Sequence, residues 1–349
     1  MLLKLYPNLL NDFSKKGPLR AFFGLFLKAI FKNEHKKLHK VLILIQSMNI
    51  IYCIQYVGVM ALTSILLKAR AKINLTLDVT GKREDGYHFV KMIMQTISLC
   101  DMVLIKKVQK PGIWLKCDVK WLPCDERNIA YKAAALMIDT FGIKEGVSIS
   151  IRKRIPVAAG LAGGSADCAA VIKGINEIFR LGLDEAELME IGSKLGSDVP
   201  FCIMEGTALA EGTGSILTKI EPCPELNLVL AKLPVSVSTA TVYKNLNCYE
   251  LPFHPDTERM ICSIKNKDVT AIASALSNVL ETVTIKMHPR IDNIKNKLVE
   301  KGALGAVMSG SGPTVFGIFA DRQTACDVAD SLRAELKLKN VYVVKTEDK

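Results

Sequence analysis

One glycine-rich segment, RIPVAAGLAGGSADCAA, has the composition of a loop that binds phosphate. It spans residues 154–170 and places Gly160, Gly163 and Gly164 close to Ser165. Consecutive backbone N–H groups and a hydroxyl at the start of a helix can bind phosphate oxygens. The segment matches neither the P-loop motif, which ends in Gly-Lys-Ser/Thr, nor the dinucleotide-binding motif G-x-G-x-x-G. A bound phosphate would therefore need a cation from elsewhere in the chain or Mg²⁺. The alternative interpretation is a tight strand-to-helix turn that binds no ligand.

Two charged residues outside this loop are candidates for phosphoryl-transfer chemistry. Lys72 lies in the stretch RAKINLTLDVTG, and Asp198 lies in GSDVPF. A lysine can stabilise the charge of a transferred phosphoryl group, and a carboxylate can accept or orient the proton of an attacking hydroxyl. Each also has an ordinary interpretation: Lys72 as a solvated lysine on a strand, and Asp198 as a capping or turn aspartate before Pro200. Tyr87 and His88 are likewise either recognition residues or half-buried strand residues.

Hydrophobic periodicity predicts the elements that must position these residues. RAKINLTLDVTG alternates between apolar and polar residues, which predicts a strand with one buried face. The polar face of this strand is formed by Lys72, Asn74, Thr76 and Asp78. Asp85-Gly86 predicts a hairpin turn directly after the strand. The candidate lysine and the Tyr87-His88 pair are therefore expected on one strand and its hairpin.

The rest of the chain alternates between predicted strands and helices. Strands are predicted at 89–99, 101–108, 112–119, 146–155, 227–234 and 341–345, and in two segments around the Gly-Ser-Gly-Pro turn of 302–320. Helices are predicted at 128–142, 165–182, 183–196, 257–266, 268–282, 288–301 and 322–336. Asp184 and Glu187 have the spacing of a capping box. The glycine-rich segment thus lies between a strand and the N-terminus of a helix, the position where phosphate binds best.

The composition is that of a globular protein with one large or two modest domains. The chain has 349 residues, of which 49% are hydrophobic and 23% are charged. Its 10 cysteines show no C-x-x-C spacing, which indicates reduced thiols in a cytoplasmic protein. The formal net charge is +11, but residues 1–40 contain nine of the basic and only two of the acidic residues. The remainder is mildly basic, so nucleic acid is not an expected partner.

Residues 1–60 form an N-terminal extension with three open interpretations. Residues 41–60 are uncharged and long enough to cross a bilayer as a helix, although they include Gln, Ser and Asn. The extension could be a membrane anchor, a docking or regulatory segment, or a segment upstream of the true start near Met60. The third interpretation is favoured because the periodic pattern begins directly afterwards. A cleaved signal peptide is not expected, since the apolar segment begins too far into the chain.

Five segments occur in the order that is typical of the GHMP kinase superfamily. They are RAKINL, DGYH, PVAAGLAGGSAD, LGSDVPF and MSGSGPTVFG. The glycine loop and MSGSGP are general to the superfamily. AKINL, followed by DGYH and later by GSDVPF, most closely resembles the kinases of 4-diphosphocytidyl-2-C-methyl-D-erythritol, which act in the non-mevalonate (MEP) route to isoprenoid precursors. The resemblance covers about residues 66–345 and leaves out the extension.

The resemblance implies roles for individual residues. Lys72 and Asp198 match the catalytic pair. The ATP-binding loop comprises Pro156, Val157, Ala158, Ala159, Gly160, Leu161, Ala162, Gly163, Gly164, Ser165 and Ala166. The substrate-binding residues are Asn74, Tyr87, His88, Thr239 and Tyr243. Tyr87 and His88 would bind the cytosine end, and Tyr243 stands where family members often have Phe.

Two details of the loop follow from the same resemblance. Ala158, Ala159 and Ala162 stand where some members have glycine, so the positions that need a positive φ are predicted to be Gly160 and the pair Gly163-Gly164. No dedicated metal ligands are implied. Mg²⁺ would be bound mainly through the ATP phosphates, with Ser165 as a candidate contact.

The resemblance implies an α+β fold of two domains. An N-terminal GHMP kinase domain, similar to domain 2 of ribosomal protein S5, would span 61–225, and a C-terminal GHMP kinase domain would span 226–349. The implied reaction is phosphorylation of the 2-hydroxyl of 4-diphosphocytidyl-2-C-methyl-D-erythritol by ATP with Mg²⁺, with no nucleic acid and no membrane partner unless residues 1–60 supply one. Two alternatives stay open: a homoserine or mevalonate-type kinase, and a kinase-fold binding protein without activity. The Tyr87-His88 pair argues against the first, and the presence of both Lys72 and Asp198 argues against the second.

Overall fold

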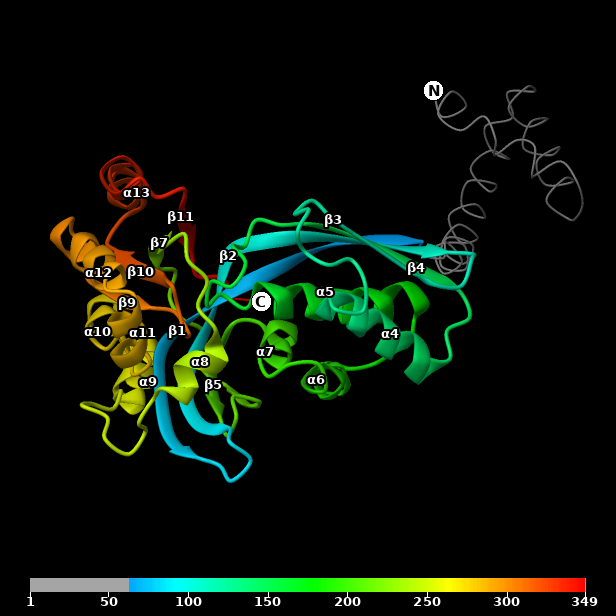
Figure 1. Ribbon diagram of the computed structural model, residues 1–349, viewed down its shortest axis with the longest axis horizontal. Coiled ribbons are helices and arrows are strands. Elements are labelled where there is room, and N and C mark those ends of the chain that lie inside the picture. Colours follow the sequence, from blue (N-terminus) through cyan, green and yellow to red (C-terminus); the bar gives the residue numbers. More distant parts are fainter. Residues whose placement is uncertain (1–62, 349) are drawn as a thin grey trace, which may run out of the picture. The chain divides into compact units, whose positions relative to one another are not determined.

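Two long antiparallel strands cross the protein, whose structure is a computed structural model (Figure 1). The structure describes residues 63–348, and the extension predicted at 1–60 lies outside them. Strand β1 (Ser64–Lys82) pairs with β2 (His88–Val108) along its whole length, with three register shifts. The turn between them contains Gly86 at φ 87°, as the Asp85-Gly86 signal predicts. Two strands were expected in place of β2, but it is continuous because Cys100 and Asp101 both pair with β1.

The two long strands belong to a seven-stranded sheet that carries the N-terminal half of the protein. Its order is β3-β4-β2-β1-β8, with β5 also paired to β2 and β6 paired to β5. The additional strands are β3 (Ile113–Cys117), β4 (Gly146–Arg152), β5 (Thr207–Glu211), β6 (Ile216–Lys219) and β8 (Ser277–Asn278). The accompanying helices are α4 (Ile129–Phe141), α5 (Gly163–Phe179), α6 (Glu185–Ser193) and α7 (Val199–Met204). Helix α5 packs on β1 and β2 and is covered by α4, α6 and α7 (Figure 1).

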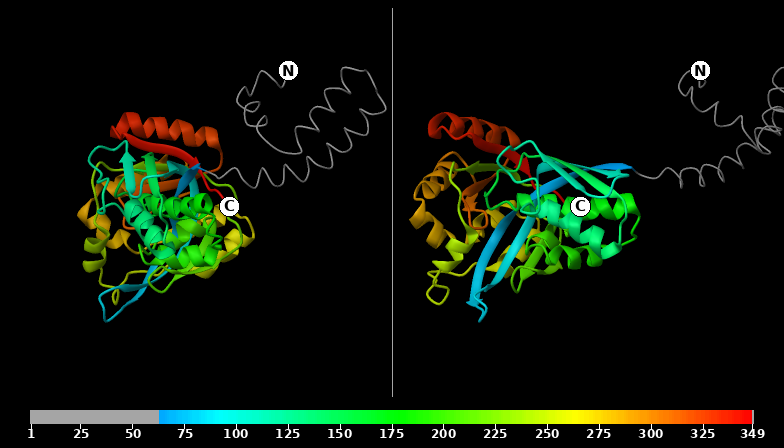
Figure 2. Two further views of the ribbon diagram at one scale, coloured as in Figure 1. Left: turned by 90° about the vertical axis from the view of Figure 1, so that its right-hand side faces the viewer. Right: turned by 45° about the vertical axis from the view of Figure 1, so that its right-hand side comes forward.

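A four-stranded antiparallel sheet forms the C-terminal half, in the order β11-β7-β10-β9. The strands are β7 (Asn227–Lys232), β9 (Gly305–Met308), β10 (Thr314–Phe319) and β11 (Asn340–Lys345). Its helices are α8 (Thr239–Lys244), α9 (Thr257–Lys265), α10 (Val269–Ser274), α11 (Glu281–Met287), α12 (Arg290–Glu300) and α13 (Arg322–Leu336). Figure 2 shows this half beside the curved end of the β1–β2 ribbon. The fold is the predicted α+β architecture, while the domain limits 61–225 and 226–349 stay a prediction.

Strand β1 differs from its expected pattern because both of its faces are buried. Ile73 and Leu75 belong to one apolar core, whereas Leu77 and Val79 belong to a second core. The change of core coincides with the register shift between Asn74 and Thr76. All four residues of the polar face are buried as well. The prediction of a half-buried strand is therefore wrong here, because other parts of the fold cover the face that alternation assigned to solvent. Asn74 contacts Met92 of β2, and Asp78 contacts His254 of the C-terminal half.

Local signals predicted most helix ends. Helix α4 ends at Gly142, which has a left-handed φ of 59°, and α6 begins with the capping box of Asp184 and Glu187. Helix α5 ends earlier than predicted, at Phe179, because Arg180 forms the left-handed C-cap. Gly182 also has a positive φ, of 74°, but it lies beyond the end of the helix. The single helix predicted at 268–282 is wrong, because β8 separates α10 from α11 and pairs with β1.

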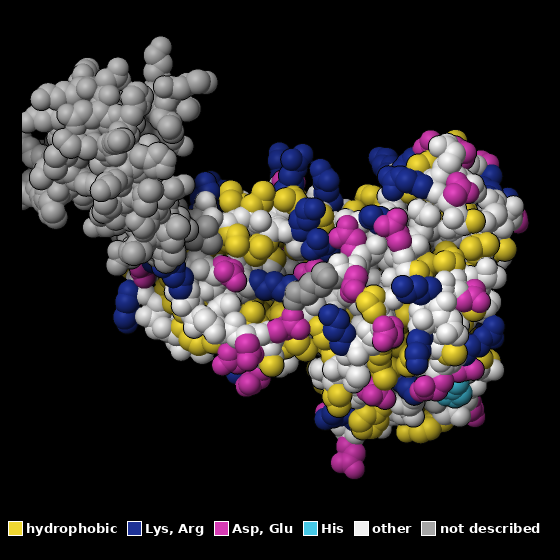
Figure 3. Space-filling view, turned by 180° about the vertical axis from the view of Figure 1, so that it is seen from behind, with side chains coloured by type: hydrophobic (Ala, Val, Ile, Leu, Met, Phe, Trp, Pro, Cys, Tyr) yellow, Lys and Arg dark blue, Asp and Glu magenta, His cyan; other side chains and the backbone are white. Residues whose placement is uncertain are grey.

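The surface of the described residues mixes both signs of charge. On the face shown in Figure 3, Lys and Arg side chains are interspersed with Asp and Glu over both halves. The nine cysteines of residues 63–348 are all free thiols. None of the helices in residues 63–348 has the length and apolar character that crossing a membrane requires.

Candidate active site

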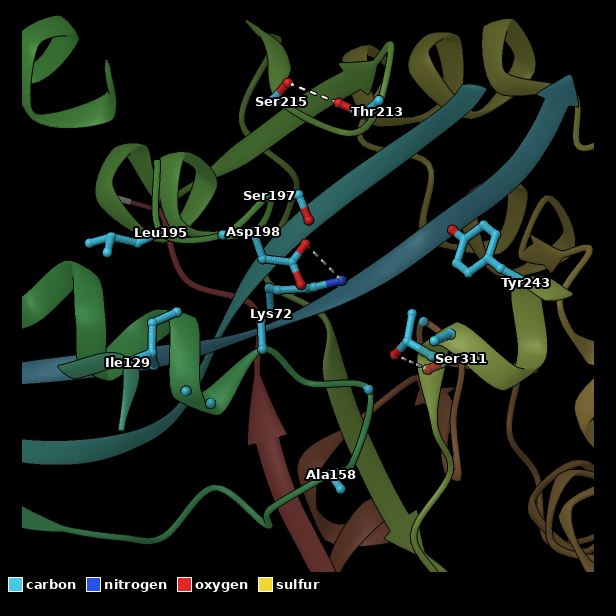
Figure 4. Close-up of a pocket in the computed structure, with 18 of the residues that line it drawn as sticks. Lys72, Ile129, Ala158, Leu195, Ser197, Asp198, Thr213, Ser215, Tyr243 and Ser311 are labelled. Carbon is cyan, nitrogen blue, oxygen red and sulfur yellow. Dashed lines mark hydrogen bonds and ion pairs between the residues drawn. The ribbon is translucent and has the colours of Figure 1, made fainter. Parts of the chain in front are cut away.

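A cavity of about 1510 Å³ is lined by segments that lie far apart in the sequence. Its walls come from the β1–β2 hairpin, the loop before α5, the turn before α7, the β5–β6 hairpin, α8 and the Gly310-Ser311 turn. Figure 4 shows Lys72 and Asp198 facing each other in the cavity. Ile129 and Leu195 lie on one side of this pair, and Tyr243 and Ser311 lie on the other. The cavity therefore has two ends with a charged pair between them.

The charged pair is open rather than closed. The Lys72 Nζ lies 3.9 Å from Oδ1 of Asp198, beyond hydrogen-bond distance. The Lys72 side chain is 6% exposed, and that of Asp198 is 33% exposed. Both residues line the cavity. A hydroxyl group or a phosphoryl oxygen can therefore approach both charged groups at once.

The carboxylate of Asp198 is not used to cap a helix. Asp198 occupies the N-cap position of α7, but its side chain accepts no capping hydrogen bond. The helix has Pro200 in its first turn, and proline lacks an N–H group that would need a partner. The interpretation of Asp198 as a capping residue is therefore wrong, and its side chain is available to the cavity.

Asn74 fixes the position of the catalytic candidate lysine. Its Oδ1 accepts a hydrogen bond of 2.8 Å from the Lys72 Nζ, and its Nδ2 donates to the sulfur of Met92 at 3.1 Å. Asn74 is fully buried and is not among the residues that line the cavity. The structure thus places the predicted substrate residue behind Lys72 rather than on the cavity wall.

The glycine loop follows β4 and leads into α5 beside Lys72. The backbone N–H of Lys72 donates to the carbonyl of Leu161 at 3.2 Å, so β1 and the loop are joined directly. Ala162 is the N-cap of α5 and supplies no side-chain cap. The first N–H groups of this helix are consequently free to bind an anion at the positive end of the helix dipole.

The backbone of this loop differs from the sequence expectation at two pairs of residues. Gly160 has a φ of 73°, as predicted, but Gly163 and Gly164 do not have a positive φ. Ala158 and Ala162 adopt the left-handed region instead, at 50° and 54°. Gly163 needs glycine for a different reason, because a Cβ there would lie 2.8 Å from Cγ2 of Ile155. The close approach of the Ile155 side chain to the backbone therefore explains this glycine, and the local sequence pattern does not reveal such a contact.

A second lysine lies below the loop in a closed ionic cluster. The Lys153 Nζ lies 2.5 Å from Oδ2 of Asp101 and 2.6 Å from Oδ2 of Asp167. Asp101 also accepts the backbone N–H groups of Arg154 and Ile155. Burial alone would lower the pKa of Lys153, but the charges of Asp167 and Asp101 raise it above its usual value. The cluster joins β2, the loop and α5, to which Asp167 belongs.

The other end of the cavity carries aromatic side chains. The rings of His88 and Tyr243 lie 5.2 Å apart with an angle of 42° between their planes, so the hairpin meets α8 here. Burial and the charge of Lys82 lower the pKa of His88, which keeps its imidazole neutral at pH 7. Tyr87 is 67% exposed at the turn. The hydroxyl of Thr239 lies 2.9 Å from that of Ser311 and joins α8 to the Gly310-Ser311 turn.

Most of the predicted site residues line this one cavity. Those on its wall are Lys72, Tyr87, His88, Pro156, Val157, Ala158, Ala159, Gly160, Ala162, Gly163, Gly164, Asp198, Thr239 and Tyr243. Four are not among the residues that line it: Asn74, Leu161 and Ala166, which are buried, and Ser165, which is half-buried in the first turn of α5. Leu161 and Ala166 are buried in the core below the loop.

Sequence reasoning missed four residues that support the site. Lys153 and Asp101 lie in stretches predicted as strands, where a charged residue gives no signal of its own. Asn278 and Glu281 lie in the segment predicted as one helix. Both bond to Met308 at the end of β9, and Asn278 also bonds to Gly310 in the turn that precedes Pro313. Residues 63–348 contain no group of three or more His, Cys, Asp or Glu side chains that could bind a metal ion.

Comparison with known families and sequences gives a consistent result. The GHMP kinases N terminal domain matches residues 128–206, and the GHMP kinases C terminal domain matches residues 260–338. A 4-diphosphocytidyl-2-C-methyl-D-erythritol kinase of Acetivibrio thermocellus is 57% identical over 270 residues, which cover 77% of this chain and 95% of that protein. The kinase of the same name from Lachnospira eligens is 47% identical over 283 residues, which cover 81% of this chain and 98% of that protein.

Solved structures show the same fold. A crystal structure of 4-(cytidine 5'-diphospho)-2C-methyl-D-erythritol kinase is similar with a TM-score of 0.71 and 28% identity, and the match covers 82% of this chain and all (100%) of that one. The mevalonate kinase of L. major in complex with R-mevalonate is similar with a TM-score of 0.65 and 16% identity, covering 82% of this chain and 98% of that one.

Proposed function

The chain belongs to the 4-diphosphocytidyl-2-C-methyl-D-erythritol kinases of the GHMP kinase superfamily, and we propose that it transfers the γ-phosphoryl group of ATP to the 2-hydroxyl of that substrate. The products are ADP and the 2-phosphate, and the reaction belongs to the MEP route to isoprenoid precursors. One observation carries the proposal: the open Lys72–Asp198 pair lies between an apolar end and an aromatic end of one cavity. Two nucleotide-sized groups and a transfer point fit this arrangement.

Asp198 and Lys72 act at the transfer point. The carboxylate of Asp198 accepts a hydrogen bond from the 2-hydroxyl and takes or orients its proton as the oxygen attacks. The ammonium group of Lys72 stabilises the charge that spreads over the phosphoryl oxygens in the transition state. The hydrogen bond to Asn74 supports this role, because it keeps the ammonium group in place before the substrate binds.

The glycine loop binds the phosphates of ATP. The free N–H groups at the start of α5 and the backbone around Gly160 supply donors, and Ile129 and Leu195 provide an apolar surface for the base. We infer that Mg²⁺ would be bound mainly through the phosphate oxygens of ATP. Ser165 in the first turn of α5 is the hydroxyl that would assist. When bound, Mg²⁺ neutralises charge on the β- and γ-phosphates.

The aromatic end binds the cytidine diphosphate part of the acceptor. Tyr87 and Tyr243 offer ring faces for stacking, and the neutral imidazole of His88 can both donate and accept a hydrogen bond on the cytosine edge. Lys82, Arg83 and Lys244 also line the cavity and suit a diphosphate. We place the reaction in the cytoplasm, which the free thiols of the described residues support.

A coupled ADP-release assay tests this proposal directly. The purified protein is given ATP, Mg²⁺ and, in separate reactions, 4-diphosphocytidyl-2-C-methyl-D-erythritol, homoserine and mevalonate. We expect turnover with 4-diphosphocytidyl-2-C-methyl-D-erythritol and none with homoserine or mevalonate. CDP should also raise the melting temperature of the protein. Turnover with homoserine or mevalonate and no stabilisation by CDP would contradict the assignment of substrate.

A further inference from the structure

Two loops that line the cavity pack against each other through their backbones. These are the glycine loop at Gly160 and the turn Ser309–Gly312 between β9 and β10. A Cβ on Gly160 would lie 2.2 Å from the carbonyl oxygen of Ser309, and one on Gly310 would lie 3.1 Å from the carbonyl oxygen of Gly160. The hydroxyl of Ser309 donates to the same Gly160 carbonyl at 2.9 Å. A shift of the turn must therefore move the glycine loop.

The turn also contacts the helix at the other end of the cavity. Ser311 follows Gly310 directly, and its hydroxyl lies 2.9 Å from that of Thr239 on α8. Helix α8 carries Tyr243, whose ring packs against His88. The turn thus lies between the loop assigned to ATP and the helix assigned to the acceptor, and it touches both.

A single buried amide fixes the turn. The Nδ2 of Asn278 donates to the carbonyl of Met308 at 2.7 Å and to that of Gly310 at 2.8 Å. Its Oδ1 accepts from the backbone N–H of Leu280 at 2.9 Å. Asn278 is fully buried, so both donors and the acceptor are satisfied within the protein. Among small neutral side chains only an asparagine offers two donors and an acceptor in this geometry.

The amide is itself placed by the strand that carries Lys72. Strand β8 has two residues, and Leu77 of β1 is the partner of Asn278 in a parallel pairing. The N–H of Val279 donates to the carbonyl of Leu77 at 3.0 Å. Glu281 adds a second connection, because its carboxylate accepts the N–H of Met308 at 2.8 Å.

We propose that Asn278 is a positioning residue that sets the Ser309–Gly312 turn relative to β1 and so aligns both substrates on Lys72. The inference rests on the proposed function for the identity of the two ligands. Asn278 touches neither ligand, and it acts through the turn on Gly160 and on Thr239. Its effect on the reaction comes from alignment, since small displacements of reacting groups reduce rates strongly.

The Asn278→Asp variant tests the proposal with an almost unchanged shape. The carboxylate keeps the acceptor for Leu280 but turns an oxygen toward the carbonyls of Met308 and Gly310, so the turn must move away. Three quantities are measured below the melting temperature: the number of CDP-binding sites, the affinity for a non-hydrolysable ATP analogue, and kcat per CDP-binding site. The matched control is Asn293→Asp, the same change at an exposed residue of α12 in the same half.

We expect kcat per CDP-binding site to fall on the order of 100-fold in Asn278→Asp. The affinity for the ATP analogue should fall about tenfold, because Gly160 moves with the turn, while the control stays near wild type. A residue with only a structural role would lower the melting temperature and the number of CDP-binding sites and leave kcat per site unchanged. That result would overturn the proposal.

A second variant covers the case in which Asn278→Asp does not fold. Ser309→Ala removes only the hydroxyl that donates to Gly160. This variant should lower the affinity for the ATP analogue about fivefold without changing the affinity for CDP. Unchanged affinity for the analogue would overturn the connection between turn and loop. Absence of turnover in the wild-type protein would instead contradict the proposed function, and the analogue measurements would still test the role of Asn278.

Discussion

Two lysines line the same cavity and are equally buried, yet their carboxylate partners differ in distance and in exposure. Lys72 lies 3.9 Å from Asp198, whose side chain is one third exposed. Lys153 is within 2.6 Å of both Asp101 and Asp167, which are almost fully buried. A closed, desolvated pair has no capacity left for a ligand, whereas an open pair has. The comparison separates a lysine that can act on a substrate from one that maintains the fold around it.

The largest effect is expected for the open pair. Asp198→Asn keeps the size of the side chain but removes the negative charge that accepts or orients the hydroxyl proton. We expect kcat to fall by about 10³-fold, while the affinity for CDP changes by less than about threefold. ADP release and CDP titration measure the two quantities. A kcat within tenfold of wild type would show that Asp198 belongs with the structural carboxylates.

Substitution in the closed cluster around Lys153 should lower the stability of the protein. Lys153→Met leaves Asp101 and Asp167 buried together without their cation, which should lower the free energy of unfolding by about 3–5 kcal/mol. Urea unfolding measures the loss, and Lys116→Met on the exposed side of β3 is the control. Equal stability of the two variants would mean that the buried cluster contributes little to the fold.

The cluster should also give stability a dependence on pH. Burial raises the pKa of Asp167 to about 7; Lys153 opposes this shift and Asp101 adds to it. A carboxyl group whose pKa is raised in the folded state stabilises the fold fully below its unfolded value, and this contribution is lost as the pH rises through the folded value.

The Asp167→Asn variant isolates this contribution because asparagine does not titrate. The free energy of unfolding of wild type minus that of the variant should decrease from about pH 4 to about pH 7 and stay level above. Urea unfolding at several pH values measures it. A difference that stays level over this range would mean that Asp167 is ionised throughout in the folded protein, which would contradict the raised pKa.

The smallest effect is expected for the glycine loop, which lies beside Lys72 and Lys153. Ala162 has a left-handed backbone, which costs a residue with a Cβ about 1–2 kcal/mol, while glycine adds about 0.5–1 kcal/mol of unfolded-state entropy. Ala162→Gly should therefore raise the free energy of unfolding by up to about 1 kcal/mol. Ala159→Gly, at a buried position without a positive φ, should lower it by about 1 kcal/mol. Equal losses in both variants would contradict the assigned backbone strain.

The sequence predicts what is encoded locally. The turn at Asp85-Gly86, the end of α4 at Gly142 and the capping box at Asp184 depend on neighbouring residues, and the structure has all three. Lys72 and Asp198 were found by motif, and the fold places them opposite each other. These features need no knowledge of distant contacts.

The features that were missed depend on contacts across the chain. Asn278 lies in a segment with helical spacing, and only its pairing with β1 makes that segment a strand. The sequence likewise gives no sign that the amide of Asn74 bonds to Lys72 and Met92, because these partners are fixed by the tertiary fold. Left-handed Ala158 and Ala162 contradict the preference for glycine, because the packing of the loop overrides it.

The difference between the two lysines is tested most directly by replacing each with methionine, which has a similar length and no charge. For each variant, kcat with 4-diphosphocytidyl-2-C-methyl-D-erythritol and the free energy of unfolding are measured on the same preparation. Lys72→Met is predicted to lower kcat by at least about 100-fold with a smaller loss of stability than Lys153→Met. Retention of kcat in Lys72→Met, or equal losses of stability in the two variants, would contradict the account.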